Sequence, residues 1–107
     1  MSETVLVTGA SGGIGRATAQ LFAQNGYNVV MACHRHERAA KEVSEALNAQ
    51  GLQTAVVTAD LSDPSAARQL VKQAVALFGG LDVLVNNAGM CQNGTVLTET
   101  RESLNRI

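Results

Sequence analysis

Hydrophobic and polar residues follow two different periods along the chain. Runs of β-branched and aliphatic residues are typical of buried strands, and four such runs occur, at residues 4–8, 28–33, 54–59 and 81–85. Between these runs, apolar residues recur every three or four positions, which is the spacing of one helix face. The pattern therefore predicts strands and helices in alternation.

The first predicted helix begins at Gly13, and Gly26 is expected to cap its C-terminus. Its inner face is predicted to comprise the methyl group of Thr18 and four apolar residues at helical spacing: Ile14, Ala17, Leu21 and Phe22.

The second predicted helix spans residues 37–50, with an inner face formed by Ala40, Val43 and Leu47. In the third, Asp63 is expected to cap the N-terminus and Pro64 to occupy the first turn, and glycines at 79 and 80 end the helix. The third inner face is predicted to comprise five residues: Ala67, Leu70, Val71, Ala74 and Phe78.

This alternation predicts an α/β fold in which parallel strands are joined by right-handed crossovers. We expect a single domain over residues 1–107, with strand order 3-2-1-4, which is half of a doubly wound sheet. After residue 89 we expect a loop rich in Gly, Thr and Asn, and a helix beginning near Glu99. The last dozen residues are expected to be the least anchored, since the elements they would pack on are absent.

Composition narrows the class of protein. The chain is 46% hydrophobic and 16% charged with net charge −1, which argues against a basic nucleic-acid surface and an acidic tail. No apolar run approaches the about 20 residues of a membrane span, and residues 1–4 lack a basic signal-peptide start. Cys33 and Cys91 share no metal-binding spacing with each other or with the histidines, so we expect reduced thiols in a cytoplasmic protein.

The stretch "TGASGGIG", residues 8–15, contains four glycines between the first strand and the first helix. A helix N-terminus offers unpaired N–H groups and the positive end of the helix dipole, which favours a phosphate. Gly9 permits the tight turn, Gly13 lets the backbone approach a pyrophosphate, and Gly15 lets the helix pack closely. Ser11 adds a hydroxyl donor. The alternative is a glycine-rich turn without a ligand.

The spacing T-G-x-x-x-G-x-G resembles the short-chain dehydrogenase/reductase family, and so do "GIGRATA" at 13–19, "ADLSD" at 59–63 and "NNAG" at 86–89. The resemblance covers essentially the whole chain and implies the cofactor-binding half of a Rossmann-like fold. It implies a nicotinamide dinucleotide as ligand, with Asp60 and Leu61 at the adenine and Asn87 bracing the sheet. The other cofactor-binding residues it implies lie in the glycine loop and after the fourth strand: Gly9, Ser11, Gly12, Gly13, Ile14, Gly15, Asn86, Ala88 and Gly89.

The end of the second strand bears on the choice of cofactor. An acidic residue there would bind the ribose 2′-hydroxyl of NAD, whereas an arginine suits the 2′-phosphate of NADP. The strand ends in Cys33-His34-Arg35, with no carboxylate before Glu37. Arg35 can pair with phosphate, and His34 can assist, more so at lower pH. We therefore expect NADP, with NAD as the alternative. Two arguments oppose NADP. Gly12 occupies a position where many NADP-using relatives carry a basic residue, and the alternative interpretation of Arg35 is a solvated loop arginine.

In the family that the motifs resemble, a Tyr-x-x-x-Lys pair and a serine act at the substrate, and an asparagine completes a proton relay. The single tyrosine here is Tyr27, and the residue four positions later is Met31. Lys41 and Lys72 lie on predicted surface helices, and the relay asparagine is expected beyond Ile107. No catalytic residue is therefore expected within the chain, whose end precedes that segment.

The resemblance implies an NADP-dependent oxidoreductase that reduces ketones or oxidises secondary alcohols, with 3-oxoacyl groups as the preferred substrate class. Complete relatives are usually homo-oligomers. The alternative is a non-catalytic dinucleotide-binding fragment or pseudogene product. A mononucleotide- or FAD-binding half of another doubly wound protein is a third possibility, against which "NNAG" argues.

Overall fold

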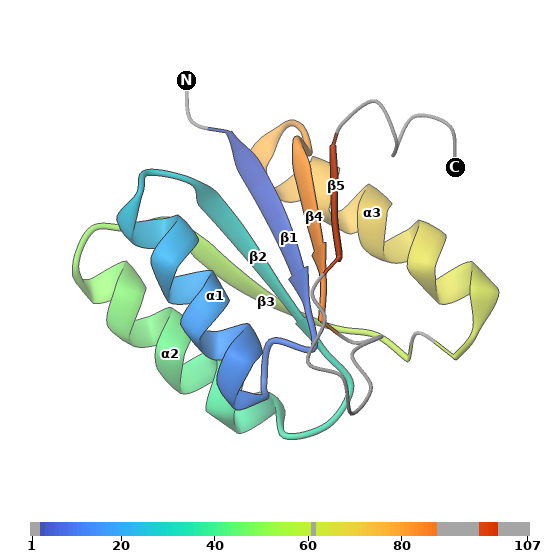
Figure 1. Ribbon diagram of the computed structural model, residues 1–107, viewed down its shortest axis with the longest axis horizontal. Coiled ribbons are helices and arrows are strands. Elements are labelled where there is room, and N and C mark those ends of the chain that lie inside the picture. The colour runs from blue at the N-terminus through green and yellow to red at the C-terminus, as the bar shows by residue number, and fades with distance from the viewer. Residues whose placement is uncertain (1–2, 61, 88–96, 101–107) are drawn as a thin grey trace.

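A computed structural model describes residues 3–60, 62–87 and 97–100. Its three helices are α1 (Gly13–Gln24), α2 (Glu37–Ala49) and α3 (Pro64–Phe78). Its five strands are β1 (Thr4–Thr8), β2 (Asn28–Cys33), β3 (Thr54–Thr58), β4 (Val83–Asn86) and β5 (Leu97–Thr100). The strands form one twisted sheet between helices (Figure 1).

The sheet has the order β3-β2-β1-β4-β5, and its first four members pair in parallel. This confirms the predicted order 3-2-1-4 and the doubly wound class. The central strand β1 is paired on both sides, with Val5 opposite Val29 of β2 and Val83 of β4. Because all four strands run the same way, their carboxyl ends meet at one edge of the sheet.

The fifth strand corrects the sequence prediction of a helix beginning near Glu99. Residues 97–100 instead pair antiparallel with β4, with Leu97 opposite Asn86 and Thr100 opposite Val83. The physical reason is that β4 would otherwise leave a row of unpaired N–H and C=O groups, and a threonine-rich segment favours extended backbone. Residues 101–107 lie outside the described residues, so the weak anchoring of the last dozen residues stays a prediction.

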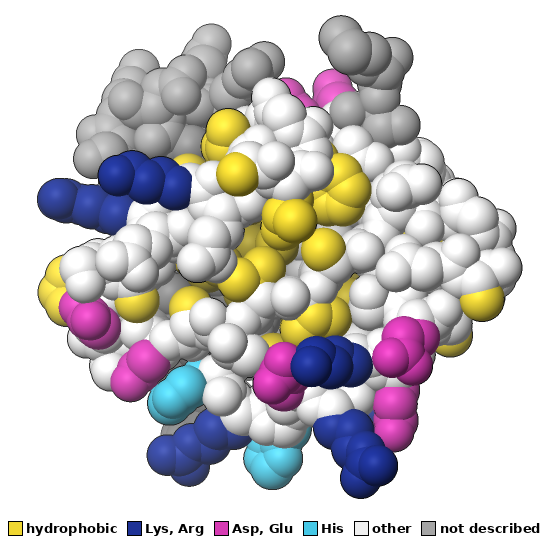
Figure 2. All heavy atoms as spheres, turned by 180° about the vertical axis from the view of Figure 1, so that it is seen from behind, with side chains coloured by type: hydrophobic (Ala, Val, Ile, Leu, Met, Phe, Trp, Pro, Cys, Tyr) yellow, Lys and Arg dark blue, Asp and Glu magenta, His cyan; other side chains and the backbone are white. Residues whose placement is uncertain are grey.

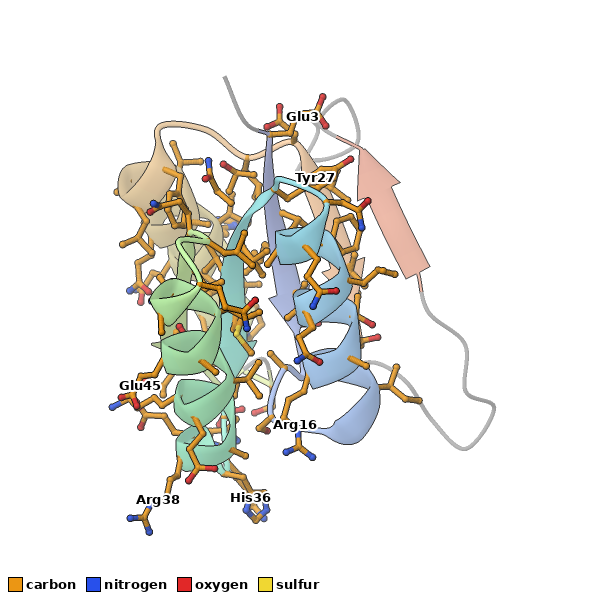
Figure 3. All side chains as sticks on the ribbon, turned by 90° about the vertical axis from the view of Figure 1, so that its left-hand side faces the viewer. Glu3, Arg16, Tyr27, His36, Arg38 and Glu45 are labelled. Carbon is orange, nitrogen blue, oxygen red and sulfur yellow. The ribbon has the colours of Figure 1, made fainter. Side chains whose placement is uncertain are left out.

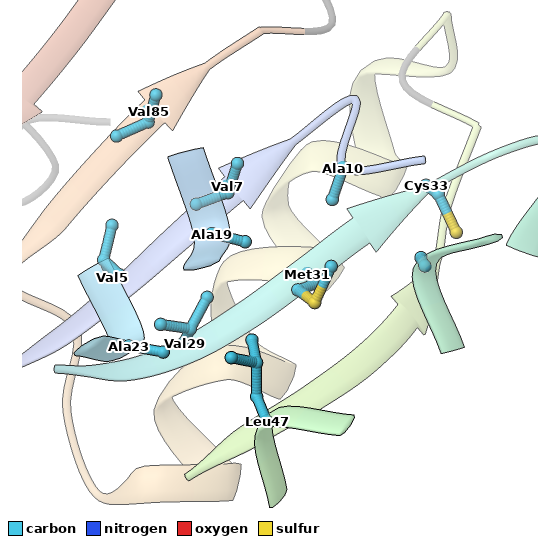
Figure 4. Packing of buried hydrophobic residues seen from close by; sticks show 11 residues of the cluster. Val5, Val7, Ala10, Ala19, Ala23, Val29, Met31, Cys33, Leu47 and Val85 are labelled. Carbon is cyan, nitrogen blue, oxygen red and sulfur yellow. The ribbon is translucent and has the colours of Figure 1, made fainter. Parts of the chain in front are cut away.

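One face of the sheet is covered by α1 and α2. The core there joins alternate strand residues to small or aliphatic helix residues (Figure 4). Its fully buried members include Val5, Val7, Val29, Met31, Ala19, Ala23, Ala40 and Leu47. The predicted inner face of α2 is confirmed, since Ala40 and Leu47 are buried and Val43 packs against the cluster.

The predicted inner face of α1 is wrong in three of its four apolar positions. Ile14 is 54% exposed, Leu21 is 61% exposed, and Ala17 is also exposed. The buried residues are instead Gly15, Ala19 and Ala23. Strand valines and Met31 already fill the space above the sheet, so the helix approaches with its smallest side chains. Phe22 stays partly buried and meets Tyr27 edge-on, with ring centroids 4.9 Å apart.

The opposite face of the sheet is covered by α3. Its cluster combines Leu6, Val30 and Ala32 of the strands with Leu70 and Ala74 of the helix. Val71 and Phe78 pack beside this cluster as predicted, whereas Ala67 is exposed. Seen from behind, hydrophobic side chains also reach the surface in the middle of the molecule (Figure 2).

The predicted ends of α3 are confirmed, whereas the C-cap of α1 is Asn25 and the predicted Gly26 lies one residue beyond it. The Asp63 side chain accepts a hydrogen bond from the Ser65 N–H at 3.0 Å, and Pro64 opens α3. Gly79 ends that helix with φ of 84°, a left-handed conformation that glycine adopts without strain. Gly26 follows α1 with φ of 90°. No described helix is long and apolar enough to cross a membrane.

Replacing Gly15 with alanine tests how closely α1 approaches the loop before it. A Cβ at Gly15 would collide with the Gly9 carbonyl oxygen and lie 2.8 Å from the Ala10 Cα, both of them backbone atoms. We expect Gly15→Ala to lower the free energy of unfolding by about 1–3 kcal/mol or more in urea titrations. Gly13→Ala is the matched control, because a Cβ there meets nothing within 4 Å. Equal stability of the two variants would contradict this packing.

Candidate functional site

A cavity of about 320 Å³ lies at the carboxyl ends of β1, β2 and β3. Open α/β sheets bind ligands at this edge, next to the point where the strand order reverses, which here lies between β1 and β4. Seven residues line the cavity: Gly9, Ser11, Ala32, Cys33, His34, Arg35 and Ala59. Four of them were predicted from the sequence, namely Gly9, Ser11, His34 and Arg35.

The glycine loop forms the wall of the cavity on the β1 side. Gly9 has φ of 62°, which turns the chain, and the Gly12 N–H donates to the Gly9 carbonyl at 3.2 Å. The Ala10 N–H donates to the Ala32 carbonyl at 2.9 Å, which ties the loop to β2. Backbone hydrogen bonds therefore hold the loop both internally and against β2.

The N-terminus of α1 carries no side-chain cap. Gly12 occupies the N-cap position, and the first intrahelical bond runs from the Arg16 N–H to the Gly12 carbonyl at 2.9 Å. The N–H groups of Gly13, Ile14 and Gly15 thus have no partner within the helix. A Cβ on Gly13 would meet open space, whereas one on Gly15 would meet the loop backbone. Gly13 leaves the helix end open to a ligand, and Gly15 allows close packing.

The end of β2 brings basic side chains to the same place. His34 and Arg35 are exposed and line the cavity. His36, which the sequence did not single out for this site, has φ of 57° and occupies the N-cap of α2. Figure 3 shows Arg16, His36 and Arg38 at one end of the molecule, far from Tyr27. This end can therefore attract an anion.

Asp60 follows β3 and faces His34. Its Oδ1 accepts hydrogen bonds from the Ser62 hydroxyl at 2.6 Å and the Ser62 N–H at 3.0 Å. Its Oδ2 lies 3.9 Å from His34 Nε2. The hydrogen bonds from Ser62 lower the pKa of the Asp60 carboxyl, and the nearby charges of His34 and Arg35 lower it further. Leu61, predicted beside it, lies outside the described residues.

Cys33 is a buried thiol on the cavity wall, and it is 4% exposed. Burial raises its pKa, Glu37 raises it further, and Lys41 lowers it. Glu37 and Lys41 themselves pair at 2.9 Å on α2. Sequence reasoning did not place Cys33 or the neighbouring Ala32 and Ala59 in the site. Their small size at the ends of two adjacent strands is the signal that would have indicated a hollow there.

Asn86 is the last residue of β4, and Asn87 comes directly after the strand. Thr8 Oγ1 donates to Asn86 Oδ1 at 3.0 Å, so Asn86 lies beside the start of the glycine loop. Asn87 was expected to brace the sheet. Its side chain is buried, yet neither amide atom has a hydrogen-bond partner in the structure as described, which marks an unfilled polar contact. Ala88 and Gly89 lie outside the described residues.

Comparison with known proteins identifies a matching family model and similar sequences. The family model described as short chain dehydrogenase matches residues 3–107. A 3-oxoacyl-[acyl-carrier-protein] reductase of Staphylococcus aureus is 38% identical over 97 residues, which cover 91% of this chain and 39% of the relative. The chain thus spans about two fifths of that curated relative.

Two solved structures are similar in fold and sequence. One is a short chain dehydrogenase from Burkholderia cenocepacia in complex with NADP, with TM-score 0.78 and 39% identity, over 87% of this chain and 38% of the other. The second is a short chain dehydrogenase/reductase from Burkholderia phymatum in complex with NAD, with TM-score 0.72 and 30% identity, over 78% of this chain and 29% of the other.

The thiol of Cys33 gives a test of the electrostatics of the cavity wall. In a Cys91→Ser background, we expect Glu37→Gln to speed the reaction of Cys33 with a disulfide reagent at pH 8, and Lys41→Gln to slow it. Each change should be about twofold or more, because Glu37 raises and Lys41 lowers the pKa of the thiol. Rate changes in the same direction for both variants would indicate local opening of α2 and contradict the assignment.

The raised pKa of Cys33 also fixes the sign of a pH effect on folding. The folded state disfavours the thiolate, so the stability from burying the neutral thiol is fully present below the ordinary thiol pKa. It is lost as pH rises through the raised pKa of the folded state.

Proposed function

The chain belongs to the short-chain dehydrogenase family, and on that premise we propose that it forms the cofactor-binding part of an NADP-dependent oxidoreductase. One observation carries this proposal. The glycine loop that leads into the uncapped N-terminus of α1 and the exposed pair His34 and Arg35 line one cavity, with no carboxylate at the end of β2. A dinucleotide needs an anion seat for its pyrophosphate, and NADP needs a second one for its 2′-phosphate.

We propose a counterpart in this site for each part of the adenosine end and for the pyrophosphate. The open space above Gly13 suits the pyrophosphate, and the guanidinium of Arg35 suits the 2′-phosphate. We assign the adenine to Asp60 and Leu61. We assign the adenosine ribose to Asn86, Ala88 and Gly89. Of these, Asn86 lies beside Thr8. NAD is the alternative cofactor, and a similar protein was solved with it.

The proposed reaction is reduction of a ketone or oxidation of a secondary alcohol. When bound, the nicotinamide supplies or accepts the hydride. The similar Staphylococcus aureus protein is a 3-oxoacyl-[acyl-carrier-protein] reductase, which supports a 3-oxoacyl or related small carbonyl compound as substrate. We further propose a single domain over residues 1–107, a cytoplasmic location, and homo-oligomers of the complete protein without nucleic-acid or membrane partners.

A second candidate function is a dinucleotide-binding fragment without turnover. The position of Tyr27 favours it for the chain as given. Tyr27 packs against Phe22 and lies at the end of the molecule away from Arg16 and His36 (Figure 3). No Tyr-x-x-x-Lys pair occurs in the 107 residues. Without that acid, a carbonyl oxygen has no proton donor of the kind the family uses.

Reversing the charge at residue 35 tests the choice of cofactor. We expect Arg35→Asp to weaken NADP binding about 10-fold or more in calorimetry and to change NAD binding far less, because it removes a cation and adds repulsion at the 2′-phosphate. Arg68→Asp is the matched control, since Arg68 is exposed on α3 and carries the same change of charge. Equal losses for NADP and NAD in Arg35→Asp would contradict the proposal.

Turnover by the 107-residue chain tests the two candidate functions against each other. We expect no NADPH oxidation above background with a panel of ketones, measured by absorbance, because the chain lacks the tyrosine acid and its lysine. The control is a variant in which a bulky residue replaces Gly13, which should block the pyrophosphate. Turnover by the wild-type chain that disappears in this variant would show that the fragment itself performs the chemistry.

A further inference from the structure

The sheet ends at β3, which pairs with β2 on one side only. Within the part of the chain that the structure describes, no strand lies on its other side, and Figure 1 shows β3 at the margin of the sheet. The Gln53 carbonyl accepts a hydrogen bond from the Val29 N–H at 2.9 Å. The Ala59 N–H donates to the Cys33 carbonyl, also at 2.9 Å. These bonds place the odd-numbered residues of the strand toward β2.

The even-numbered residues of β3 direct their backbone groups away from β2. This follows because the N–H and C=O groups of a strand alternate between its two sides from one residue to the next. We call the outward backbone groups of Thr54, Val56 and Thr58 the β3 edge. Such an edge can accept a further strand, since its N–H and C=O groups are the same as those that join the other strands.

Asn48, in the last turn of α2, occupies the place of a neighbouring strand at one end of the β3 edge. Its Oδ1 accepts a hydrogen bond from the Thr54 N–H at 2.9 Å, and its Nδ2 donates to the Thr54 carbonyl at 3.3 Å. One side-chain amide thus pairs with both backbone groups of a single residue. A residue of an adjoining antiparallel strand would make the same pair of bonds.

Further contacts between α2 and β3 fix the position of this amide. The Thr54 hydroxyl lies 2.9 Å from Asn48 Oδ1 and 3.1 Å from the Ser44 carbonyl, to either of which it can donate. It also lies 2.6 Å from the Ser44 hydroxyl. Ser44 and Thr54 are buried, whereas Asn48 is exposed. The buried contacts therefore hold Asn48 at the edge while its outer side faces solvent.

A second copy of this chain fits the β3 edge because the edge is complementary to itself. Antiparallel pairing about a twofold axis through Val56 sets Val56 opposite Val56 of the second copy, and Thr54 opposite its Thr58. Residues 54–59 carry no charged side chain, so no like charges would meet there. Uncharged edge strands rich in valine and threonine favour association of this kind.

We propose that Asn48 closes the β3 edge to a second copy of this chain. Each outer pair of such an association joins Thr54 of one copy to Thr58 of the other, and Asn48 already engages both backbone groups of Thr54. Only the central pair at Val56 is left. The bonds of one residue pair do not offset the loss of rotational and translational freedom on association. The inference is independent of the nucleotide site.

The test is self-association of the full chain, measured by sedimentation velocity over a wide range of protein concentration. We expect Asn48→Ala to self-associate about tenfold or more tightly than the wild type, because it frees both outer pairs for hydrogen bonding. Alanine is a better helix former than asparagine at this exposed position, and Asn48→Ser is a second variant with the same expectation.

The matched control is Asn25→Ala. Asn25 is likewise exposed at the end of a helix, but its Nδ2 donates to the Leu21 carbonyl of its own helix at 2.7 Å. It should associate like the wild type. Thermal unfolding of each variant checks that it is folded.

Amide hydrogen exchange locates the contact between the copies. In Asn48→Ala, the amides of Val56 and Thr58 should become more protected as the protein concentration rises. Adding Thr58→Pro should restore wild-type association, since it removes an outward N–H from an exposed residue and leaves the bonds to β2 intact.

Three results would overturn the inference. The first is association of Asn48→Ala and Asn48→Ser no tighter than that of the wild type. The second is equal tightening in Asn25→Ala, which would indicate general destabilisation. The third is a dimer whose Val56 and Thr58 amides exchange as in the monomer, which would place the contact on another surface.

Discussion

The whole site depends on the close approach of the first turn of α1 to the loop that precedes it. Gly15 lies against the backbone of Gly9 and Ala10, at a distance that no Cβ could occupy. The Ala10 N–H is bonded in turn to the Ala32 carbonyl of β2. These contacts fix the N-terminus of α1 above the sheet edge where three parallel strands end. The open side of Gly13 and the dipole of the helix are thereby directed to one place.

The two ends of the molecule carry different chemical groups. At the carboxyl ends of the strands lie the glycine loop, the basic pair His34 and Arg35, and the carboxylate of Asp60. At the other end Tyr27 packs on Phe22 and contributes to the core. Groups suited to an anion thus lie at one end of the described residues, and the single tyrosine of the sequence lies at the other end.

Local sequence signals predicted the elements well, and tertiary packing decided what they missed. The strand boundaries at 4–8 and 28–33 and the cap at Asp63 were predictable, because β-branched runs and capping side chains act within a few residues. The buried side of α1 was not predictable from the sequence. Ile14 and Leu21 have helical spacing, but the space above the sheet admits only Ala19 and its small neighbours. The strand at 97–100 arises from an unpaired sheet edge. The 3.9 Å approach of His34 to Asp60 joins residues 26 positions apart, and single-residue patterns do not report such distances.

The most direct test of the central claim, that this edge of the sheet holds the adenosine end of NADP, is an NMR titration of the ¹⁵N-labelled chain with NADP. The account predicts that the largest amide shift changes fall on the glycine loop, on His34 and Arg35, and near Asp60, while Tyr27 and the C-terminal turn of α2 remain unchanged. Saturable shift changes that avoid the glycine loop, or none at millimolar NADP, would contradict it.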